Sequence, residues 1–264
     1  MPYLSPALNV MTTAARKAGR KLTRDFGEVE NLQISFKGPA DFVTAADRRT
    51  ERMLIEELSK ARPGYNFLVE EQGVIEGPDK SHRFIIDPLD GTTNFLHGIP
   101  HFSISIALER EGLLVSAVIY NPVTDEMYTA ERGHGAYLND KRLRVATRKH
   151  LKESLFATGI PFLGKEGHED FLKELSTVMG SSAGVRRFGS AALDLAYVAA
   201  GRYDGFWERG LQAWDIAAGI LIVREAGGMV SDLGGGARAL ETGDILAAND
   251  TLHPQLLKLL KSPG

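Results

Sequence analysis

Apolar residues near the start of the chain recur at helical spacing. Steps of three or four residues separate Leu8, Met11, Ala15, Ala18 and Leu22. Lysine and arginine occupy the other face, so the pattern predicts an amphipathic helix over about residues 5–25. A second helix is predicted over about residues 46–60, where the sequence ARPG should end it.

The stretch between these helices and the whole central part of the chain have the character of strands. ISFKGPADFVT is predicted as a strand and loop, and YNFLVEEQG and RFIIDPLDG each as a short strand with a loop. FSISIALER, LLVSAVIYNP and EMYTAERG follow one another closely with turn residues between them. They predict an antiparallel meander from about residue 102 to 137.

The second half of the chain alternates between strand and helix patterns. SLFATGI, AGVRRFG, DGFWER, MVSDLGG and ILAAND are predicted as strands. EDFLKELSTVM, SAALDLAYVAAG, AWDIAAGILIVREAGG and HPQLLKLLK are predicted as helices. A basic connector near residues 144–150 separates a half of residues 1–145 from a half of residues 146–264. The pattern favours a layered α+β or mixed α/β protein that forms one compact unit.

Composition excludes several functional classes. The 264 residues carry a net charge of −3, which disfavours nucleic-acid binding through a broadly basic surface. The chain has no cysteine, so it has no disulfide, zinc–thiolate site or thiol nucleophile. No apolar stretch approaches the roughly 20 residues that cross a bilayer, and the N-terminus lacks a signal-peptide pattern. We therefore expect a cytoplasmic protein without membrane attachment.

Two carboxylates stand at the end of a buried strand in FIIDPLDGTTN, residues 84–94. Asp87 and Asp90 are costly there unless something pairs with them. With the Leu89 carbonyl between them, they form an all-oxygen donor set of the kind that Mg²⁺ prefers. The backbone N–H groups that follow could bind an anion, which points to phosphate chemistry. Asp-Pro and Asp-Gly are also common turn dipeptides, so DPLDG taken alone is more often a structural turn than a metal site.

Other acidic residues stand where predicted elements begin or end. They are Asp47, Glu70 and Asp215. Taken singly, each has an ordinary structural explanation as a helix cap or an exposed charge. The joint pattern is what favours a site.

That joint pattern resembles the inositol monophosphatase family. The sequence DPLDGTTN at residues 87–94 and WDIAAG at residues 214–219 match two family motifs. The pair Glu70-Glu71 and the segment from Asp41 to Asp47 match two more, in family order. The resemblance spans most of the chain and implies a layered αβαβα sandwich, usually a homodimer. It is strongest to bacterial inositol-1-monophosphatases of the extragenic-suppressor type.

The resemblance also implies roles for individual residues. The metal ligands would be Glu70, Asp87, the Leu89 carbonyl, Asp90 and Asp215. Asp47 and Thr92, with Glu70, would hold and activate the attacking water. Substrate would contact Leu89, Asp90, Gly91, Thr92, Thr93, Gly189, Ser190, Ala191, Glu208 and Asp215. The implied cofactor is Mg²⁺, two or three ions, with Li⁺ as an inhibitor. The implied reaction is hydrolysis of inositol monophosphate.

Two alternatives stay open at this point. The motifs specify the chemistry rather than the alcohol, so another sugar or nucleotide phosphate could be the substrate. Relatives of this type are also associated with RNA polymerase, and the segment KRLRVATRK at residues 141–149 is a candidate basic contact. Such a run is more often a solvated connector. Gln72 and Ala213 depart from residues common in relatives, which bears on substrate preference and lithium sensitivity.

Overall fold

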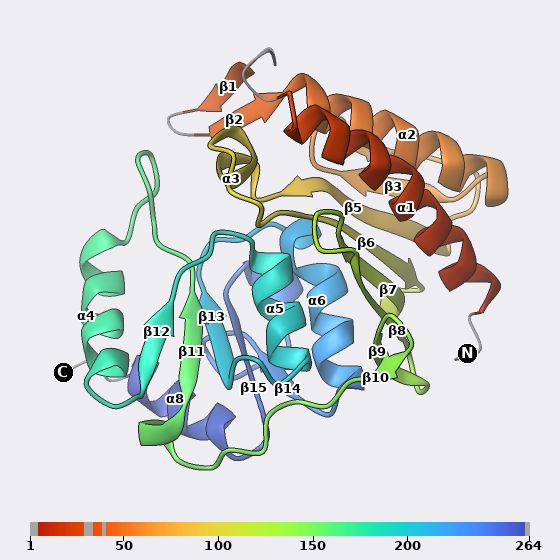
Figure 1. Ribbon diagram of the computed structural model, residues 1–264. Helices are drawn as coiled ribbons and strands as arrows, with labels where there is room; N and C mark the ends of the chain where they lie inside the picture. Colours follow the sequence, from red (N-terminus) through yellow and green to blue (C-terminus); the bar gives the residue numbers. More distant parts are fainter. Residues whose placement is uncertain (1–4, 29–33, 39–40, 262–264) are drawn as a thin grey trace.

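The structure is a computed structural model that describes residues 5–28, 34–38 and 41–261. Two sheets and three pairs of helices stack as five layers (Figure 1). One helix pair covers the outer face of the larger sheet, a second lies between the two sheets, and a third covers the outer face of the smaller sheet. This order of layers confirms the αβαβα sandwich.

The six layer-forming helices have clear bounds. The outer pair on the larger sheet is α1 (Pro6–Phe26) and α2 (Ala45–Ala61), the central pair is α5 (Ala191–Ala199) and α6 (Ala213–Glu225), and the pair on the smaller sheet is α4 (His168–Met179) and α8 (Leu252–Lys261). The central pair is apolar on nearly all sides because both of its faces meet a sheet. These helices confirm the predicted pattern.

The larger sheet has eight strands in the order β10-β9-β8-β7-β6-β5-β3-β4. Its strands are β3 (Asn66–Val69), β4 (Gly73–Ile75), β5 (His82–Asp90), β6 (Ser103–Arg110), β7 (Leu113–Asn121), β8 (Glu126–Glu131), β9 (Gly135–Leu138) and β10 (Lys141–Arg142). All neighbouring pairs are antiparallel except β3 and β5, which are parallel. The three predicted strands of the meander are therefore β6, β7 and β8, and β9 extends it by a fourth strand.

The smaller sheet has five strands in the order β12-β11-β13-β15-β14. Its strands are β11 (Leu155–Thr158), β12 (Gly184–Arg186), β13 (Gly205–Glu208), β14 (Met229–Ser231) and β15 (Ile245–Ala248). The two sheets fall on either side of residue 145, but α6 packs on strands of the larger sheet as well as on β14. Because of this shared packing, the division into residues 1–145 and 146–264 stays a prediction.

The first helix shows why local sequence forms these elements. Ser5 caps α1 by accepting a hydrogen bond from the Leu8 N–H at 3.2 Å, and Pro6 occupies the first turn, where its missing N–H costs nothing. The predicted apolar stripe is buried against the larger sheet. Each fully buried leucine of this kind contributes about 1.5–3 kcal/mol relative to exposure.

Short elements escaped the sequence patterns. They are β4, β9, β10, the single-turn α3 (Thr92–Leu96), the 3₁₀ turn η2 (Leu151–Glu153) and α7 (Ala239–Thr242). The predicted strand and loop at ISFKGPADFVT is a hairpin of β1 (Ile34–Gly38) and β2 (Asp41–Thr44), and residues 39–40 lie outside the described part. None of the helices in the described part of the chain has the length and apolar character that crossing a bilayer requires.

Candidate active site

The parallel pair β3 and β5 brings the first two acids together. Val69 pairs with Ile86, so Glu70 and Asp87 follow at the same edge of the sheet. The carboxyl ends of parallel strands meet at one edge, and sites gather there in layered folds. The sheet register thus joins residues that are 17 positions apart in the sequence.

A β-bulge turns the next acid toward the same place. Asp87 pairs with Ser105 and Asp90 with Ser103 of β6, so Pro88 and Leu89 together oppose one residue. Strict alternation would send residues three apart to opposite faces of the sheet. The bulge, at a proline that has no N–H to donate to the ladder, allows both carboxylates to line one cavity.

Asp90 is held by the start of α5. Its Oδ2 accepts hydrogen bonds from the Ser190 hydroxyl and from the Ala192 N–H, the latter at 2.9 Å. Ser190 is the N-cap of this helix. The loop of Gly189, Ser190 and Ala191, which was predicted to contact substrate, therefore positions the Asp90 carboxylate. The same three residues also line the cavity.

Asp215 lies in the first turn of α6. Its Oδ2 accepts a hydrogen bond from the Gln212 N–H at 2.7 Å, and the Ser105 hydroxyl donates to the carbonyl of Trp214 at 3.3 Å. A carboxylate is favoured at a helix N-terminus, because the exposed N–H groups carry partial positive charge there. The capping role and a place in the site are thus compatible.

The turn after β5 assembles a hydroxyl–carboxylate pair. The Thr92 Oγ1 lies 3.2 Å from Oδ1 of the buried Asp47 and 3.0 Å from the Leu89 carbonyl oxygen. Gly91 makes the turn possible with φ of 96°, and a Cβ there would approach the His101 carbonyl to 3.1 Å. Asn94 donates to the carbonyls of His101 and Phe188, which ties this turn to the loop before α5.

One cavity of about 800 Å³ collects these groups. Of the residues singled out in the sequence, its lining includes Glu70, Asp87, Leu89, Asp90, Gly91, Thr92, Thr93, Gly189, Ser190, Ala191, Glu208 and Asp215. Asp47 is fully buried behind Thr92 and reaches the cavity through that hydroxyl. His97 and Arg186 are exposed and do not belong to the lining.

The cavity concentrates negative charge. Burial, followed by the charges of Glu70, Asp90 and Asp215, raises the pKa of Asp87 well above its ordinary value. Burial also raises the pKa of Asp90 to about 6, and burial together with Asp90 raises that of Asp215. Buried carboxylates that repel one another in this way are strongly stabilised by a cation.

The donor set fits divalent cations that prefer oxygen. In the described ranges, no three acidic or histidine side chains are arranged as a preformed metal cage. One oxygen of each of Asp87, Asp90 and Asp215 instead accepts hydrogen bonds from nearby backbone or hydroxyl groups. Among the described residues, the second oxygens of Asp87 and Asp215 accept no hydrogen bond, and the chemistry of the group matches Mg²⁺ rather than a softer metal.

Comparison with known proteins agrees with this geometry. The model of the "Inositol monophosphatase family" matches residues 3–263. The chain belongs to the inositol monophosphatase family. An inositol-1-monophosphatase of Mesorhizobium japonicum is 62% identical over 98% of this chain and 97% of its own length. The "Nus factor SuhB" of Pseudomonas aeruginosa is 45% identical over 98% of this chain and 97% of its own.

A solved structure is also very similar. The extragenic suppressor protein suhB of Bartonella henselae has a TM-score of 0.96 and 58% sequence identity. The match covers 98% of this chain and 99% of that one. The family fold therefore extends over essentially the whole chain.

Glu208 ends β13 and lies directly against the backbone of the neighbouring strand. An ideal Cβ built on Gly159, just after β11, would lie 1.9 Å from the Glu208 Oε1. Burial and the nearby Asp90 raise the pKa of Glu208 to about 8, while Arg187 opposes the shift. The close approach fixes the position of the carboxylate that the family resemblance assigns to substrate hydroxyls.

We expect the Gly159→Ala substitution to impair substrate recognition without unfolding the protein. The methyl group would push away the flexible end of the Glu208 side chain, which costs little stability. Loss of one hydroxyl contact should raise KM for inositol monophosphate about tenfold. Steady-state kinetics and a thermal melt measure the two effects. An unchanged KM would show that the Glu208 position is unimportant.

Six charged residues of the cavity lining were not assigned to the site from the sequence: Lys165, Glu166, Glu174, Arg187, Asp194 and Arg209. Asp194 on α5 is buried in the cavity wall, and burial followed by the Glu208 charge raises its pKa. Arg187 and Lys165 supply positive charge to the lining. Arg187 could have been suspected from its place two residues before Gly189, but no sequence pattern distinguishes Lys165 or Asp194 from surface and core residues.

Gln72, which departs from the residue common in relatives, has a structural partner. Its side chain donates to Oε1 of the buried Glu51 at 2.8 Å, and the Glu71 N–H donates to the other oxygen at the same distance. Glu51 on α2 thus holds the turn that follows Glu70. The departure is accommodated without a direct contact to the cavity lining.

Proposed function

We propose that this protein hydrolyses inositol monophosphate to inositol and phosphate with a metal-activated water. The observation that carries the proposal is the convergence of Glu70, Asp87, Asp90 and Asp215 on one cavity beside the Thr92–Asp47 pair. The Mesorhizobium japonicum relative, whose name states this activity, supports the choice of alcohol. The large cavity also holds Glu208, an acceptor suited to a polyol hydroxyl.

In this proposal, the metal-holding residues are Glu70, Asp87, the Leu89 carbonyl, Asp90 and Asp215. Bound divalent cations would supply charge neutralisation on the phosphoryl oxygens and a lowered pKa for a coordinated water. Phosphate monoesters hydrolyse extremely slowly without such help. Magnesium dependence and inhibition by Li⁺ are parts of the proposal.

The chain's own residues account for the remaining chemistry. Thr92 Oγ1 would accept a hydrogen bond from the attacking water while it donates to Asp47 Oδ1, which orients the water and offers a route for its proton. The N–H groups at the start of α3, with Gly189 and Ser190, would face the phosphate. Arg187 and Lys165 would attract the anion, and Glu208 would accept from a hydroxyl of the alcohol.

A phosphate-release panel tests the proposal. We expect release that depends on Mg²⁺, is inhibited by Li⁺, and is fastest for inositol monophosphate among sugar, polyol and nucleotide phosphates. A faster rate on fructose bisphosphate, histidinol phosphate or a 3′-phosphoadenosine nucleotide would support the other phosphatases of the superfamily instead. No magnesium-dependent release from any member would contradict the phosphatase assignment.

A second function is a regulatory contact with RNA polymerase. The observation in its favour is a relative named as a Nus factor, together with the exposed basic segment of residues 141–149. In this segment Leu143 is buried and Arg148 pairs with Asp204 at 2.8 Å, so the backbone is well held while most basic side chains face solvent. Capture of polymerase by an inactive Asp90→Asn protein would support it. Equal capture by a variant with neutralised Lys141, Arg142 and Lys149 would exclude this segment.

The family resemblance completes the proposal with a homodimer and a cytoplasmic location. Sedimentation velocity of the purified protein tests the dimer.

A further inference from the structure

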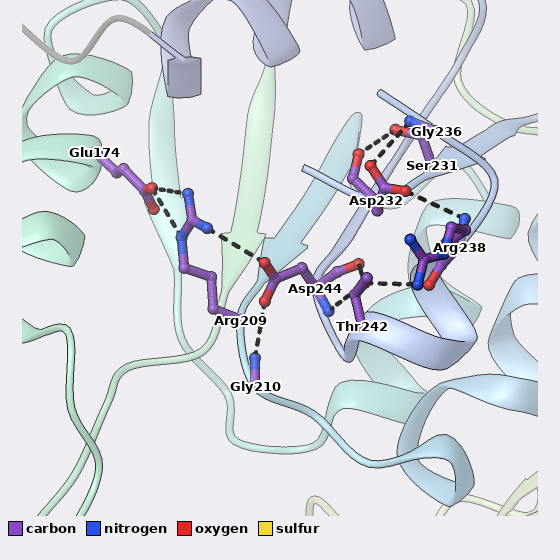
Figure 2. Close-up of polar contacts among 9 residues, drawn as sticks. All are labelled: Glu174, Arg209, Gly210, Ser231, Asp232, Gly236, Arg238, Thr242 and Asp244. Carbon is purple, nitrogen blue, oxygen red and sulfur yellow. Dashed lines mark hydrogen bonds and ion pairs between the residues drawn. The ribbon is translucent and has the colours of Figure 1, made fainter. Parts of the chain in front are cut away.

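A buried glutamate and an arginine connect α4 to the segment that follows β13. Arg209 donates through Nε and Nη2 to Oε1 of Glu174, at 3.0 Å for Nε (Figure 2). The Glu174 side chain is only 3% exposed, whereas that of Arg209 is 47% exposed. Arg209 is thus the charge partner that allows a carboxylate to be buried on α4.

The same arginine reaches a second acid on the far side. Its Nη1 lies 3.4 Å from Oδ2 of Asp244, and the other oxygen of Asp244 accepts from the Gly210 N–H at 3.2 Å (Figure 2). Next along the chain, the Leu211 N–H donates to the Gly243 carbonyl at 2.9 Å. Consecutive residues 209–211 are therefore all fixed to α4 or to the turn after α7.

The segment held in this way connects two residues of the proposed active site. Glu208 immediately precedes Arg209, and the Gln212 N–H donates to Asp215. Glu174, Arg209, Gly210 and Leu211 lie in the wall of the same cavity. A shift of this segment would move the acceptor for the alcohol on one side and the start of α6 on the other.

We propose that Arg209 is a positioning residue for Glu208, acting through the Glu174–Arg209–Asp244 bridge. The proposal rests on the proposed phosphatase function. Arg209 does not touch the reacting atoms; it holds the segment that presents Glu208 to the alcohol part of the substrate. Displacements of about 1 Å in such a segment are enough to reduce catalysis by large factors.

Paired variants test the bridge. Arg209→Met removes the bridge but leaves the buried Glu174 carboxylate without its partner, which destabilises the fold. The double variant E174L/R209M removes both charges, so we expect it to fold. Arg238→Met is the matched control, because Arg238 also bridges to a carboxylate, Glu241, near α7 but both side chains are largely exposed. Arg209→Lys keeps the charge and should rescue part of the function.

Two readouts separate positioning from general stability. In E174L/R209M we expect faster hydrogen exchange at the Gly210, Leu211 and Gln212 amides, whose acceptors are Asp244, Gly243 and Asp215. We also expect the ratio of kcat/KM for inositol monophosphate to that for p-nitrophenyl phosphate to fall about tenfold, mainly through KM. The second ester has no alcohol hydroxyl for Glu208 to bind.

A double-mutant cycle completes the test. Once Glu208→Ala has removed the acceptor, adding the bridge variant should leave the ratio unchanged. A folded double variant with an unaltered ratio would overturn the proposal, whether or not its amides exchange faster. Failure of the wild-type protein to release phosphate from any ester would instead contradict the phosphatase function. Even in that case, amide exchange in E174L/R209M that equals the wild-type exchange would refute the role of the bridge in holding the segment.

Discussion

Replacing Asp90 by asparagine should reduce phosphate release at saturating Mg²⁺ by about 10³-fold or more, which corresponds to roughly 4 kcal/mol of transition-state stabilisation. Asp90 is proposed as a metal ligand at the centre of the acidic cavity, and the amide oxygen that replaces its carboxylate carries no negative charge. The amide oxygen can still accept from the Ser190 hydroxyl and the Ala192 N–H. The variant should therefore fold, and the loss should lie in kcat.

The control for this variant is Asp125→Asn. Asp125 is an exposed acid that accepts from Arg16 and Tyr120 at the outer surface, and it has a positive φ of 52° that asparagine tolerates well. Turnover should be unchanged in the control. Without metal, Asp90→Asn should melt at or above the wild-type temperature, because one of several repelling charges has been removed. A near-normal rate in Asp90→Asn would exclude Asp90 as a ligand.

Magnesium should raise the melting temperature of the wild-type protein by roughly 5–10 °C when its concentration is about 100 times the dissociation constant. Binding to the folded state alone stabilises it by about 2.7 kcal/mol under those conditions, and about 1 kcal/mol shifts a domain of this size by about 2–4 °C. The physical source is the repulsion among the buried carboxylates, which the cation relieves. Thermal scans with and without a chelator measure the shift.

Asp215→Asn provides the matched test of this second result. The amide oxygen of asparagine can still accept from the Gln212 N–H, so α6 should begin normally while the carboxylate is lost. The magnesium shift should shrink markedly in this variant and stay intact in Asp125→Asn. A wild-type protein that melts at the same temperature with and without Mg²⁺, at matched ionic strength, would contradict a magnesium site in this cavity.

The elements of the fold were largely readable from local patterns. Helix α1 was predicted from the apolar stripe of Leu8, Met11, Ala15, Ala18 and Leu22. Such a stripe is visible in the sequence because the residues of one helix face are only three or four positions apart. The meander from β6 to β8 was predictable for the same reason, since each strand pairs with the next. Single-turn α3 and the two-residue β10 are too short to show a period, so no pattern could reveal them.

The candidate site divides in a similar way. Motif spacing selected Asp87, Asp90 and Asp215, and family order connected them to Asp47 and Glu70. Nothing in the alternation of β5 indicates that Asp87 and Asp90 share a cavity, because residues three apart on a regular strand face opposite sides. The bulge at Pro88 decides this, and a bulge is a property of the pairing with β6.

By itself, the sequence determined the order of elements, the absence of thiol chemistry, and the set of oxygen-bearing side chains from which a cation site could be built. Tertiary structure alone decided which of these side chains meet. The parallel register of β3 and β5 joins Glu70 to Asp87, and the packing of α5 and α6 between two sheets brings Ser190 and Asp215 to Asp90. Arg209 ties the segment after Glu208 to Glu174 and Asp244. Local propensity acts over a few residues, whereas these contacts join positions from 17 to more than 100 residues apart, and only the burial of the whole core fixes them.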